Sequence, residues 1–319
     1  MLTVLIATKN RAWLLPRVME SFCALQVPSS GWKLVVVDNG STDGTGQVLA
    51  EFATRLPMHV LIETTPGKNN ALNAGVRFIE GDLAVFTDDD VFPRTDWLLE
   101  LRKAADVHTD YTLFGGPIVP FWEATAPRWV GWVELGPVFS LTDPSLTEGE
   151  LRPLKVYGPN MVIRSHIFHS GIRFDSEIGP CGTDYAMGSE SELTMRLEGV
   201  GHKAWFVSQA VVAHFVRRDQ LKTSWVLGRA YRYGRGNFRL FHMRYLEDHF
   251  VERSMDIPHP LIREFIGACG KIFRAMFSFK WETVFRACYQ FNFLRGRMVE
   301  ARRVIQQQRL SKTTEGRVM

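Results

Sequence analysis

The chain has 319 residues, of which 45% are hydrophobic, and its net charge is +4 at pH 7. It can therefore bury a large core, and its length fits one large domain with an appendage. No apolar run is long enough for a transmembrane helix, and we expect no signal peptide, because the apolar start MLTVLIATKNR is short and no basic segment precedes it. The four cysteines are scattered without C-x-x-C spacing, which predicts reduced thiols of a cytosolic protein and no cysteine metal site.

Four short runs rich in valine, isoleucine and leucine predict β-strands, and three segments between them have a helical pattern. The strands are expected at residues 2–8, 33–38, 59–63 and 83–88, and the helices at 11–25, 45–54 and 69–79. Nearly continuous apolar strands that alternate with helices predict an α/β fold, in which helices cover both faces of a mostly parallel sheet.

Three of the predicted strands end in polar residues. TKNR follows the first strand, DNGS follows the second, and three consecutive aspartates, Asp88, Asp89 and Asp90, follow the fourth. Ligands of open α/β sheets bind beyond the carboxyl ends of the strands. We therefore expect these residues to share one rim of the sheet and to form a ligand site.

The three aspartates indicate a divalent cation. Closely spaced carboxylates are hard oxygen donors that suit Mg²⁺ or Mn²⁺, and such cations commonly complete their shell with phosphate oxygens. In extended backbone Asp88 and Asp90 point to one side and Asp89 to the other, so the outer two can share a ligand. A solvated acidic turn is the alternative. Neither G-x-x-x-x-G-K-[ST] nor G-x-G-x-x-G follows the first strand, so P-loop and Rossmann phosphate sites are not supported.

Five sequence blocks occur in an order and spacing that resemble the family 2 glycosyltransferases of GT-A fold. They are VLIATKNR, VVVDNGSTDGT, GKNNALNAGV, VFTDDDV and GSESELTMRL, and the resemblance covers about residues 1–240. It implies a GT-A nucleotide-diphospho-sugar transferase domain there. It also implies inverting transfer of a sugar from a nucleotide-diphosphate sugar, with a UDP-sugar favoured, to an acceptor hydroxyl. The implied setting is bacterial surface-polysaccharide or glycolipid synthesis, with a glycan or lipid-linked acceptor.

The resemblance also assigns roles to residues that match the family motifs. The implied roles are Asp38, Thr8 and Asn10 at the nucleobase, Lys68 near the nucleotide, Asp88 at the ribose, and Asp90 with His214 at Mn²⁺ or Mg²⁺. Simpler roles remain open: Asp38 can shape a turn, His214 can be a core residue, and Asn73 can bond only backbone. Arg217 and Arg218 can either hold phosphates or face solvent.

The catalytic base is expected at the start of a helix, in GSESELTMRLEGVG. Ser189 and Glu192 have the spacing of a capping box, which leaves Glu190 free at the mouth of this helix as the base. The family usually has a Glu-Asp pair where this chain has Ser189 and Glu190, so its single carboxylate is one methylene longer. The residues of this helix expected to face the core are Leu193, Leu197 and Val200.

The segment 121–160 contains Trp122, Trp129 and Trp132 among several prolines. Tryptophan faces suit sugar rings, so these side chains are candidates to cover the acceptor site. Isolated aromatic residues also anchor loops onto a core, and this alternative stays open.

Charge is distributed unevenly along the chain. Residues 1–216 contain 17 Lys and Arg against 25 Asp and Glu, a net of −8, whereas residues 217–319 contain 21 against 9, a net of +12. An acidic body with a basic final section indicates two surfaces with different partners.

The basic section has aromatic residues four apart, which predicts two helices broken near residues 278–279. The aromatic residues are Phe273, Phe277, Trp281, Phe285, Tyr289 and Phe293, and the interspersed cations are Lys271, Arg274, Lys280, Arg286, Arg295 and Arg297. This pattern favours a basic amphipathic extension at residues 241–319 that binds an anionic membrane surface, on the inner face of the cytoplasmic membrane. Packing against the body or a second subunit is the alternative. We expect no nucleic-acid partner.

Two other functions are consistent with part of the pattern. A sugar nucleotidyltransferase would need a glycine-rich basic loop after the first strand, where this chain has Ala-Thr-Lys-Asn. A non-catalytic protein that binds glycan or supports a polysaccharide assembly is disfavoured by Asp88, Asp90 and Glu190, although Ser189 departs from the family pattern.

Overall fold

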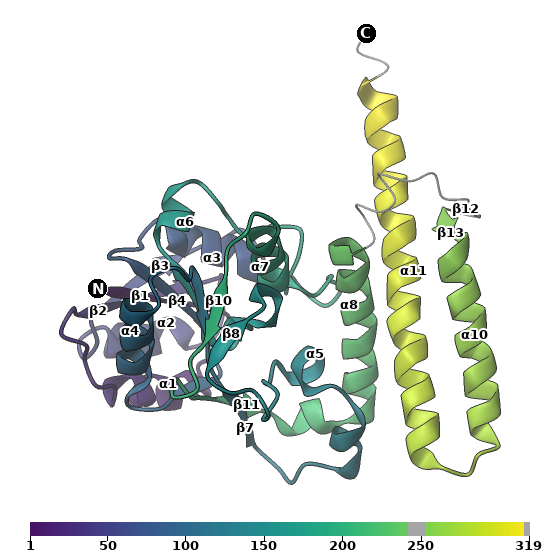
Figure 1. The fold of residues 1–319 in the computed structure, drawn as a ribbon, viewed down its shortest axis with the longest axis horizontal. Helices are drawn as coiled ribbons and strands as arrows, with labels where there is room; N and C mark the ends of the chain where they lie inside the picture. Colours follow the sequence, from purple (N-terminus) through teal and green to yellow (C-terminus); the bar gives the residue numbers. More distant parts are fainter. Residues whose placement is uncertain (242–252, 255, 316–319) are drawn as a thin grey trace. The chain divides into compact units, whose positions relative to one another are not determined.

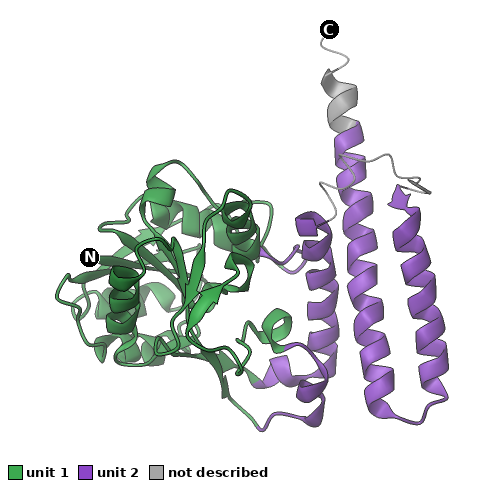
Figure 2. Cartoon of the chain, viewed as in Figure 1, with its two compact units in different colours: residues 1–124, 135–182, 189–217 green, residues 125–134, 183–188, 218–319 purple. Residues whose placement is uncertain are grey.

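The computed structural model describes residues 1–241, 253–254 and 256–315 (Figure 1). The chain forms two compact units (Figure 2). Unit 1 comprises residues 1–124, 135–182 and 189–217, and unit 2 comprises residues 125–134, 183–188 and 218–319.

Unit 1 is built on an eight-stranded sheet with the strand order β3-β2-β1-β4-β9-β6-β10-β8. Its strands are β1 (Leu2–Thr8), β2 (Trp32–Asp38), β3 (Met58–Ile62), β4 (Leu83–Asp88), β6 (Leu113–Gly115), β8 (Gly149–Leu151), β9 (Met161–Arg164) and β10 (Ala204–Phe206). The helices are α1 (Leu15–Cys23), α2 (Thr45–Phe52), α3 (Lys68–Val76), α4 (Trp97–Val107), α5 (Leu135–Phe139), α6 (His166–His169) and α7 (Ser189–Gly199), with short 3-10 turns at Pro153–Lys155 and Gly158–Asn160.

The predicted α/β fold is confirmed. All four predicted strands are present within one residue at each end, and β1, β2, β3 and β4 pair in parallel. Leu5 and Val35 join Leu72 of α3 in one buried cluster, and their chain neighbours Val4 and Leu34 are also fully buried. Because adjacent strand residues point to opposite faces, both faces of the sheet are covered.

The three predicted helices are present but shorter. The first begins at Leu15 instead of residue 11, because Asn10 has a positive φ of 53° and Pro16 occupies the first turn. In α7 the expected burial of Leu193 and Leu197 is confirmed, but that of Val200 was wrong. The helix ends at Gly199, so Val200 lies beyond its last turn and is 73% exposed.

A second, three-stranded sheet in unit 1 has the order β5-β11-β7. Its strands are β5 (Val91–Pro93), β7 (Ile118–Trp122) and β11 (Val212–Val216). β5 begins directly after the three aspartates, and His214 of β11 is the register partner of Val91. This pairing brings a histidine from late in the chain to the acidic end of β4.

The described residues of unit 2 form three long helices, and the predicted helix break is confirmed. They are α8 (Thr223–Phe241), α10 (His259–Met276) and α11 (Trp281–Glu315), accompanied by β12 (Arg253–Ser254), β13 (Ile257–Pro258) and 3-10 turns at Arg128–Trp132 and Arg218–Leu221. α10 ends at Met276 and α11 starts at Trp281. None of the helices in the described part of the chain combines the length and the apolar character that crossing a bilayer requires.

A buried ion network joins α8 to α11 inside unit 2. Arg235 and Arg239 both bind the carboxylate of Glu300, at 2.6 and 2.5 Å, and Arg235 also pairs with Asp184. Glu300 is fully buried and Arg235 nearly so. Loss of one partner would leave a buried charge uncompensated, so this network favours one register of the two helices.

Two glycines allow α8 and α11 to approach closely, and we expect Gly234→Ala to destabilise unit 2. A Cβ on Gly234 would lie 2.8 Å from the carbonyl carbon of Phe293, and one on Gly296 would lie 2.9 Å from that of Tyr231. Backbone atoms cannot rotate away, so the helices must separate, at a cost of about 3 kcal/mol. Thermal unfolding followed by circular dichroism would show a lower melting temperature.

Gly270→Ala in α10 is the matched control, because no atom lies within 4 Å of the added Cβ. Alanine also favours helix over glycine, so this variant should keep or slightly raise the melting temperature. Equal melting temperatures for the two variants would contradict close packing at Gly234.

Candidate active site

The parallel register aligns three strand ends at one edge of the sheet in unit 1. Thr8 at the end of β1 is the partner of Asp38 at the end of β2, and Ala7 is the partner of Asp88 at the end of β4. The predicted rim of polar residues is therefore present, and all residues that form it belong to unit 1.

Asp88, Asp90 and His214 form a cluster suited to a metal ion. Each offers one ligand atom, and these atoms all lie within 4.8 Å of one another. The Nε2 atom of His214 lies 3.3 Å from Oδ1 of Asp90, while Nδ1 lies 2.7 Å from the backbone oxygen of Phe139. A proton on Nδ1 would be donated to that oxygen and would leave Nε2 available as a ligand. Two carboxylates and one imidazole fit Mn²⁺ or Mg²⁺.

Asp89 has a different role from its two neighbours. Its carboxylate accepts hydrogen bonds from Thr8 Oγ1 at 2.8 Å and from Arg11 Nε at 2.9 Å. A terminal nitrogen of Arg11 also lies 3.4 Å from Asp90. The extended backbone expected for the three aspartates is not present: β4 ends at Asp88, and Asp89 and Asp90 form a turn in which Arg11 contacts both. The sequence placed Arg11 on the rim as part of TKNR, but its pairing with the aspartates was not predicted.

The ionised state of this cluster is set by its neighbours. Burial raises the pKa of Asp90, but the charges of His214 and Arg11, with a contribution from Arg217, outweigh burial and lower it to about 2. Burial lowers the pKa of His214, but Asp90 outweighs burial and raises it. Burial, with the adjacent Asp90 charge, raises the pKa of Asp89 despite the opposing Arg11. Asp90 is thus held as a carboxylate, ready for a cation.

Lys68, at the start of α3, links Asp88 to Glu190. Its Nζ donates to Asp88 Oδ1 and to Glu190 Oε1, each at 2.6 Å. Burial alone lowers the pKa of a lysine, but the two carboxylates outweigh burial and raise the pKa of Lys68. The lysine therefore remains charged and fixes the two carboxylates on either side of one ammonium group.

Glu190 lies in the first turn of α7, as predicted. The prediction that Ser189 and Glu192 form a capping box was wrong. The hydroxyl of Ser189 donates to the side-chain oxygen of Asn69 in α3, and the carboxylate of Glu192 pairs with Arg196 at 2.5 Å. A tertiary partner and an i,i+4 partner have replaced the reciprocal capping bonds. Nor is Glu190 free at the helix mouth, because Lys68 binds it.

The backbone of Gly158 lies directly against the side chain of Glu190. A Cβ at residue 158 would lie 2.7 Å from Cγ of Glu190 and would overlap its carboxylate. The glutamate therefore rests directly on glycine backbone. This contact could not be predicted from the sequence, because nothing in the spacing joins residue 158 to residue 190.

Asp38 and Asn10 shape the loops at the rim. Asp38 Oδ1 accepts a hydrogen bond from the backbone of Ser41 at 2.8 Å, which is the turn that its sequence favoured. Asn10 accepts from the backbone of Thr42 at 2.8 Å. Asn73 exchanges two hydrogen bonds of 2.9 Å with the backbone of Phe174, so its simpler role is confirmed.

The three tryptophans of residues 121–160 pack against aromatic side chains of their own units. In unit 1, Trp122 meets Phe139 edge-on, with ring centroids 5.6 Å apart. In unit 2, Trp129 stacks on Phe285 at 5.6 Å, and Trp132 is tilted against it at 5.8 Å. These contacts are those expected of loop anchors.

The sequence matches the profile described as glycosyl transferase family 2 over residues 3–167. The glycosyltransferase AglE of Haloferax volcanii is 24% identical over 241 residues, which cover 75% of this chain and 73% of that protein. The glucosyl-dolichyl phosphate glucuronosyltransferase of the same organism is 22% identical over 205 residues, covering 63% of this chain and 65% of that protein.

A similar solved structure is the mannosyltransferase PcManGT from Pyrobaculum calidifontis in complex with GDP-Man and Mn²⁺. The TM-score is 0.62 at 16% sequence identity, and the match covers 94% of this chain and 86% of that chain. This likeness shows the shared GT-A fold.

Proposed function

Since the chain belongs to glycosyl transferase family 2, we propose that it transfers a sugar from a nucleotide-diphosphate sugar to an acceptor hydroxyl, with inversion at the anomeric carbon. The observation that carries this proposal is the pairing of a cation cluster, Asp88, Asp90 and His214, with a separate carboxylate, Glu190, across one lysine. Transfer needs both parts, because the leaving diphosphate requires electrophilic help and the acceptor hydroxyl requires a base.

Each residue has a part in this reaction. Asp90 and His214 would hold Mn²⁺ or Mg²⁺, and the bound cation supplies positive charge to the leaving diphosphate. Lys68 keeps Glu190 oriented, and Glu190 takes the proton of the acceptor hydroxyl as it attacks. Asp88 faces the ribose. Thr8, Asn10 and Asp38 line the nucleobase pocket, for which a UDP-sugar is our favoured occupant.

The acceptor is proposed to be lipid-linked or a glycan, in surface-polysaccharide or glycolipid synthesis. One relative is named for action on glucosyl-dolichyl phosphate, which supports a lipid carrier. We assign transfer to residues 1–240 and attachment to residues 241–319, whose basic helices would bind the anionic inner face of the cytoplasmic membrane.

A thermal-shift screen tests the donor proposal. With Mn²⁺ present, one class of sugar nucleotide should raise the melting temperature by about 5 °C or more at a ligand concentration about 100 times Kd, because ligands that bind the native state stabilise it. EDTA should remove most of the shift, and the same sugar nucleotide should be consumed when acceptor is added. A protein that no sugar nucleotide stabilises, with or without Mn²⁺, would contradict the proposal.

A further inference from the structure

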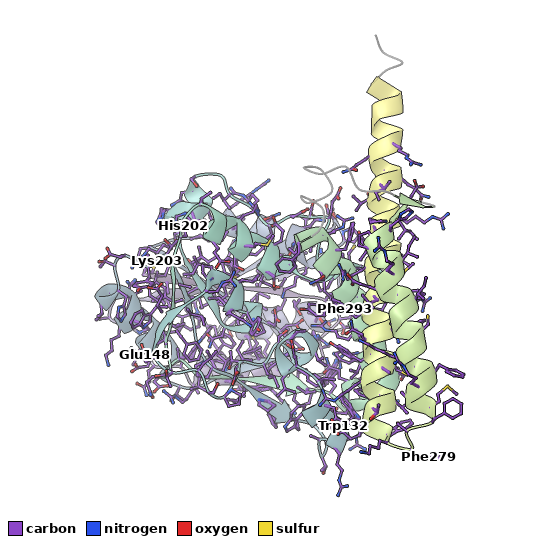
Figure 3. All side chains as sticks on the ribbon, turned by 45° about the vertical axis from the view of Figure 1, so that its right-hand side comes forward. Trp132, Glu148, His202, Lys203, Phe279 and Phe293 are labelled. Atoms are coloured by element: carbon purple, nitrogen blue, oxygen red, sulfur yellow. The ribbon has the colours of Figure 1, made fainter. Side chains whose placement is uncertain are left out.

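The turn that joins α10 to α11 exposes an unusual amount of apolar surface. We call residues 271–281 the hairpin tip. Phe279 is 98% exposed and lies at the turn (Figure 3). Four other large apolar side chains of the hairpin tip are each 65–66% exposed: Phe273, Met276, Phe277 and Trp281. Exposed apolar groups gathered in one short segment mark an interaction site.

The aromatic pattern does not continue as an exposed stripe along α11. Phe285 is only 4% exposed, because Trp129 and Trp132 cover it. Phe293 is half-buried against Tyr233, with ring centroids 5.2 Å apart. Phe285 and Phe293 belong to the aromatic pattern that favoured membrane binding, but other side chains cover them, as the packing alternative expects. Exposed aromatic surface is concentrated at the hairpin tip.

The hairpin tip is also positively charged. It carries Lys271, Arg274 and Lys280, all exposed, and no acidic residue occurs between Glu264 and Glu282. Apolar side chains mixed with cations complement the interface of an anionic membrane, in which charged headgroups cover an apolar acyl layer. A second copy of the chain would instead place like charges against each other.

A pocket of about 570 Å³ adjoins the hairpin tip within unit 2. Its lining residues are Arg128, Trp129, Trp132, Lys280, Trp281, Glu282 and Thr283. Two cations can bind a phosphate, and tryptophan is the side chain that favours the level of lipid headgroups. The pocket can therefore receive one anionic headgroup when the hairpin tip enters the interface.

We propose that the hairpin tip docks into an anionic lipid bilayer, with Phe277 and Phe279 entering the acyl boundary and Lys271, Arg274 and Lys280 at the headgroups. This inference rests on the membrane attachment proposed above and confines that attachment to one end of the helical hairpin. The rest of α10, residues 259–270, rises about 18 Å along the helix axis away from the hairpin tip.

Vesicle sedimentation tests the aromatic part. The full chain should bind vesicles of phosphatidylcholine mixed with phosphatidylglycerol, and Phe277→Ser with Phe279→Ser should reduce binding by about 100-fold or more, since two phenyl rings are no longer buried in the acyl boundary. Ile266→Ser is the control, because this residue is 63% exposed on α10 outside the hairpin tip. It should bind as the unaltered protein does.

Charge removal gives a second, matched pair. Lys271, Arg274 and Lys280 changed together to Gln should weaken binding about 100-fold, because each cation near an anionic surface contributes roughly a factor of five. Arg263, Arg302 and Arg303 changed to Gln remove the same net charge at exposed positions of these helices outside the hairpin tip. Residue 263 is about 12 Å from residue 271 along α10, beyond the screening length of about 8–10 Å, so the control should keep near-normal binding.

Three results would overturn the proposal. They are equal weakening by both sets of charge substitutions, equal binding to vesicles of phosphatidylcholine alone, and sedimentation that changes with protein concentration but not with lipid, which would indicate a second copy as the occupant. Donor-induced thermal shift of the same variants separates this inference from the proposed function. A variant that keeps the donor-induced rise in melting temperature but no longer binds vesicles has lost only membrane attachment.

Discussion

Replacing Glu190 with glutamine is expected to reduce sugar transfer by about 100-fold or more while donor affinity persists. Glutamine keeps the size of the side chain and can still contact Lys68, which binds the carboxylate at 2.6 Å, but it cannot take the acceptor proton. Single-turnover transfer and donor titration, measured on the same preparation, would separate the two effects.

Glu192→Gln is the matched control for this variant. It removes the same charge from the same helical turn, yet Glu192 is engaged by Arg196 and touches none of the residues assigned to the reaction. Transfer by the control should stay near normal. Near-normal turnover by Glu190→Gln would instead contradict the assignment of Glu190 as the base.

Replacing Asp90 with alanine or asparagine is expected to abolish the Mn²⁺-dependent part of donor binding. Asp90 is buried, its pKa is lowered to about 2, and its carboxylate lies in the cluster with Asp88 and His214. Affinity for the donor in Mn²⁺ should fall by about 100-fold or more, since even residues that only support metal ligands commonly cost 10–100-fold in metal affinity. Calorimetric titration of donor with Mn²⁺ and with EDTA would measure the change.

The asparagine variant guards against misfolding, because it retains hydrogen bonding to the buried His214 and Arg11. Asp89→Asn is the control from the same acidic triplet. Asp89 is bound by Thr8 and Arg11 and lies outside the cation cluster, so this variant should retain a donor affinity that depends on Mn²⁺. The metal role would be wrong if the unaltered protein bound donor equally well with chelator present.

The sheet and its rim were predictable because both follow from local pattern. Continuous apolar strands require covered faces, and parallel strands bring their carboxyl ends to one edge, so residues 8, 38 and 88 had to meet. The cluster of Asp88, Asp90 and His214 was predictable in part: the aspartates follow from this edge, whereas His214 was implied only by resemblance.

Contacts between distant segments escaped prediction. The hydroxyl of Ser189 has a local capping partner by sequence, but Asn69 competes for it after α3 and α7 pack together. Spacing also shows which aromatic residues share a helical face without showing what covers them. Trp129 and Trp132 come from a segment about 150 residues earlier and bury Phe285, while Phe277 has no such cover and stays exposed.

The contact between Gly158 and Glu190 ties two distant positions together during evolution. A side chain at 158 would collide with a glutamate at 190, and its Cβ would also lie 2.7 Å from Cγ, a carbon that aspartate shares with glutamate. Shortening the acid in the same rotamer would therefore not make room for alanine at 158. Among descendants of this chain, glycine should persist at 158 wherever position 190 keeps an acidic residue.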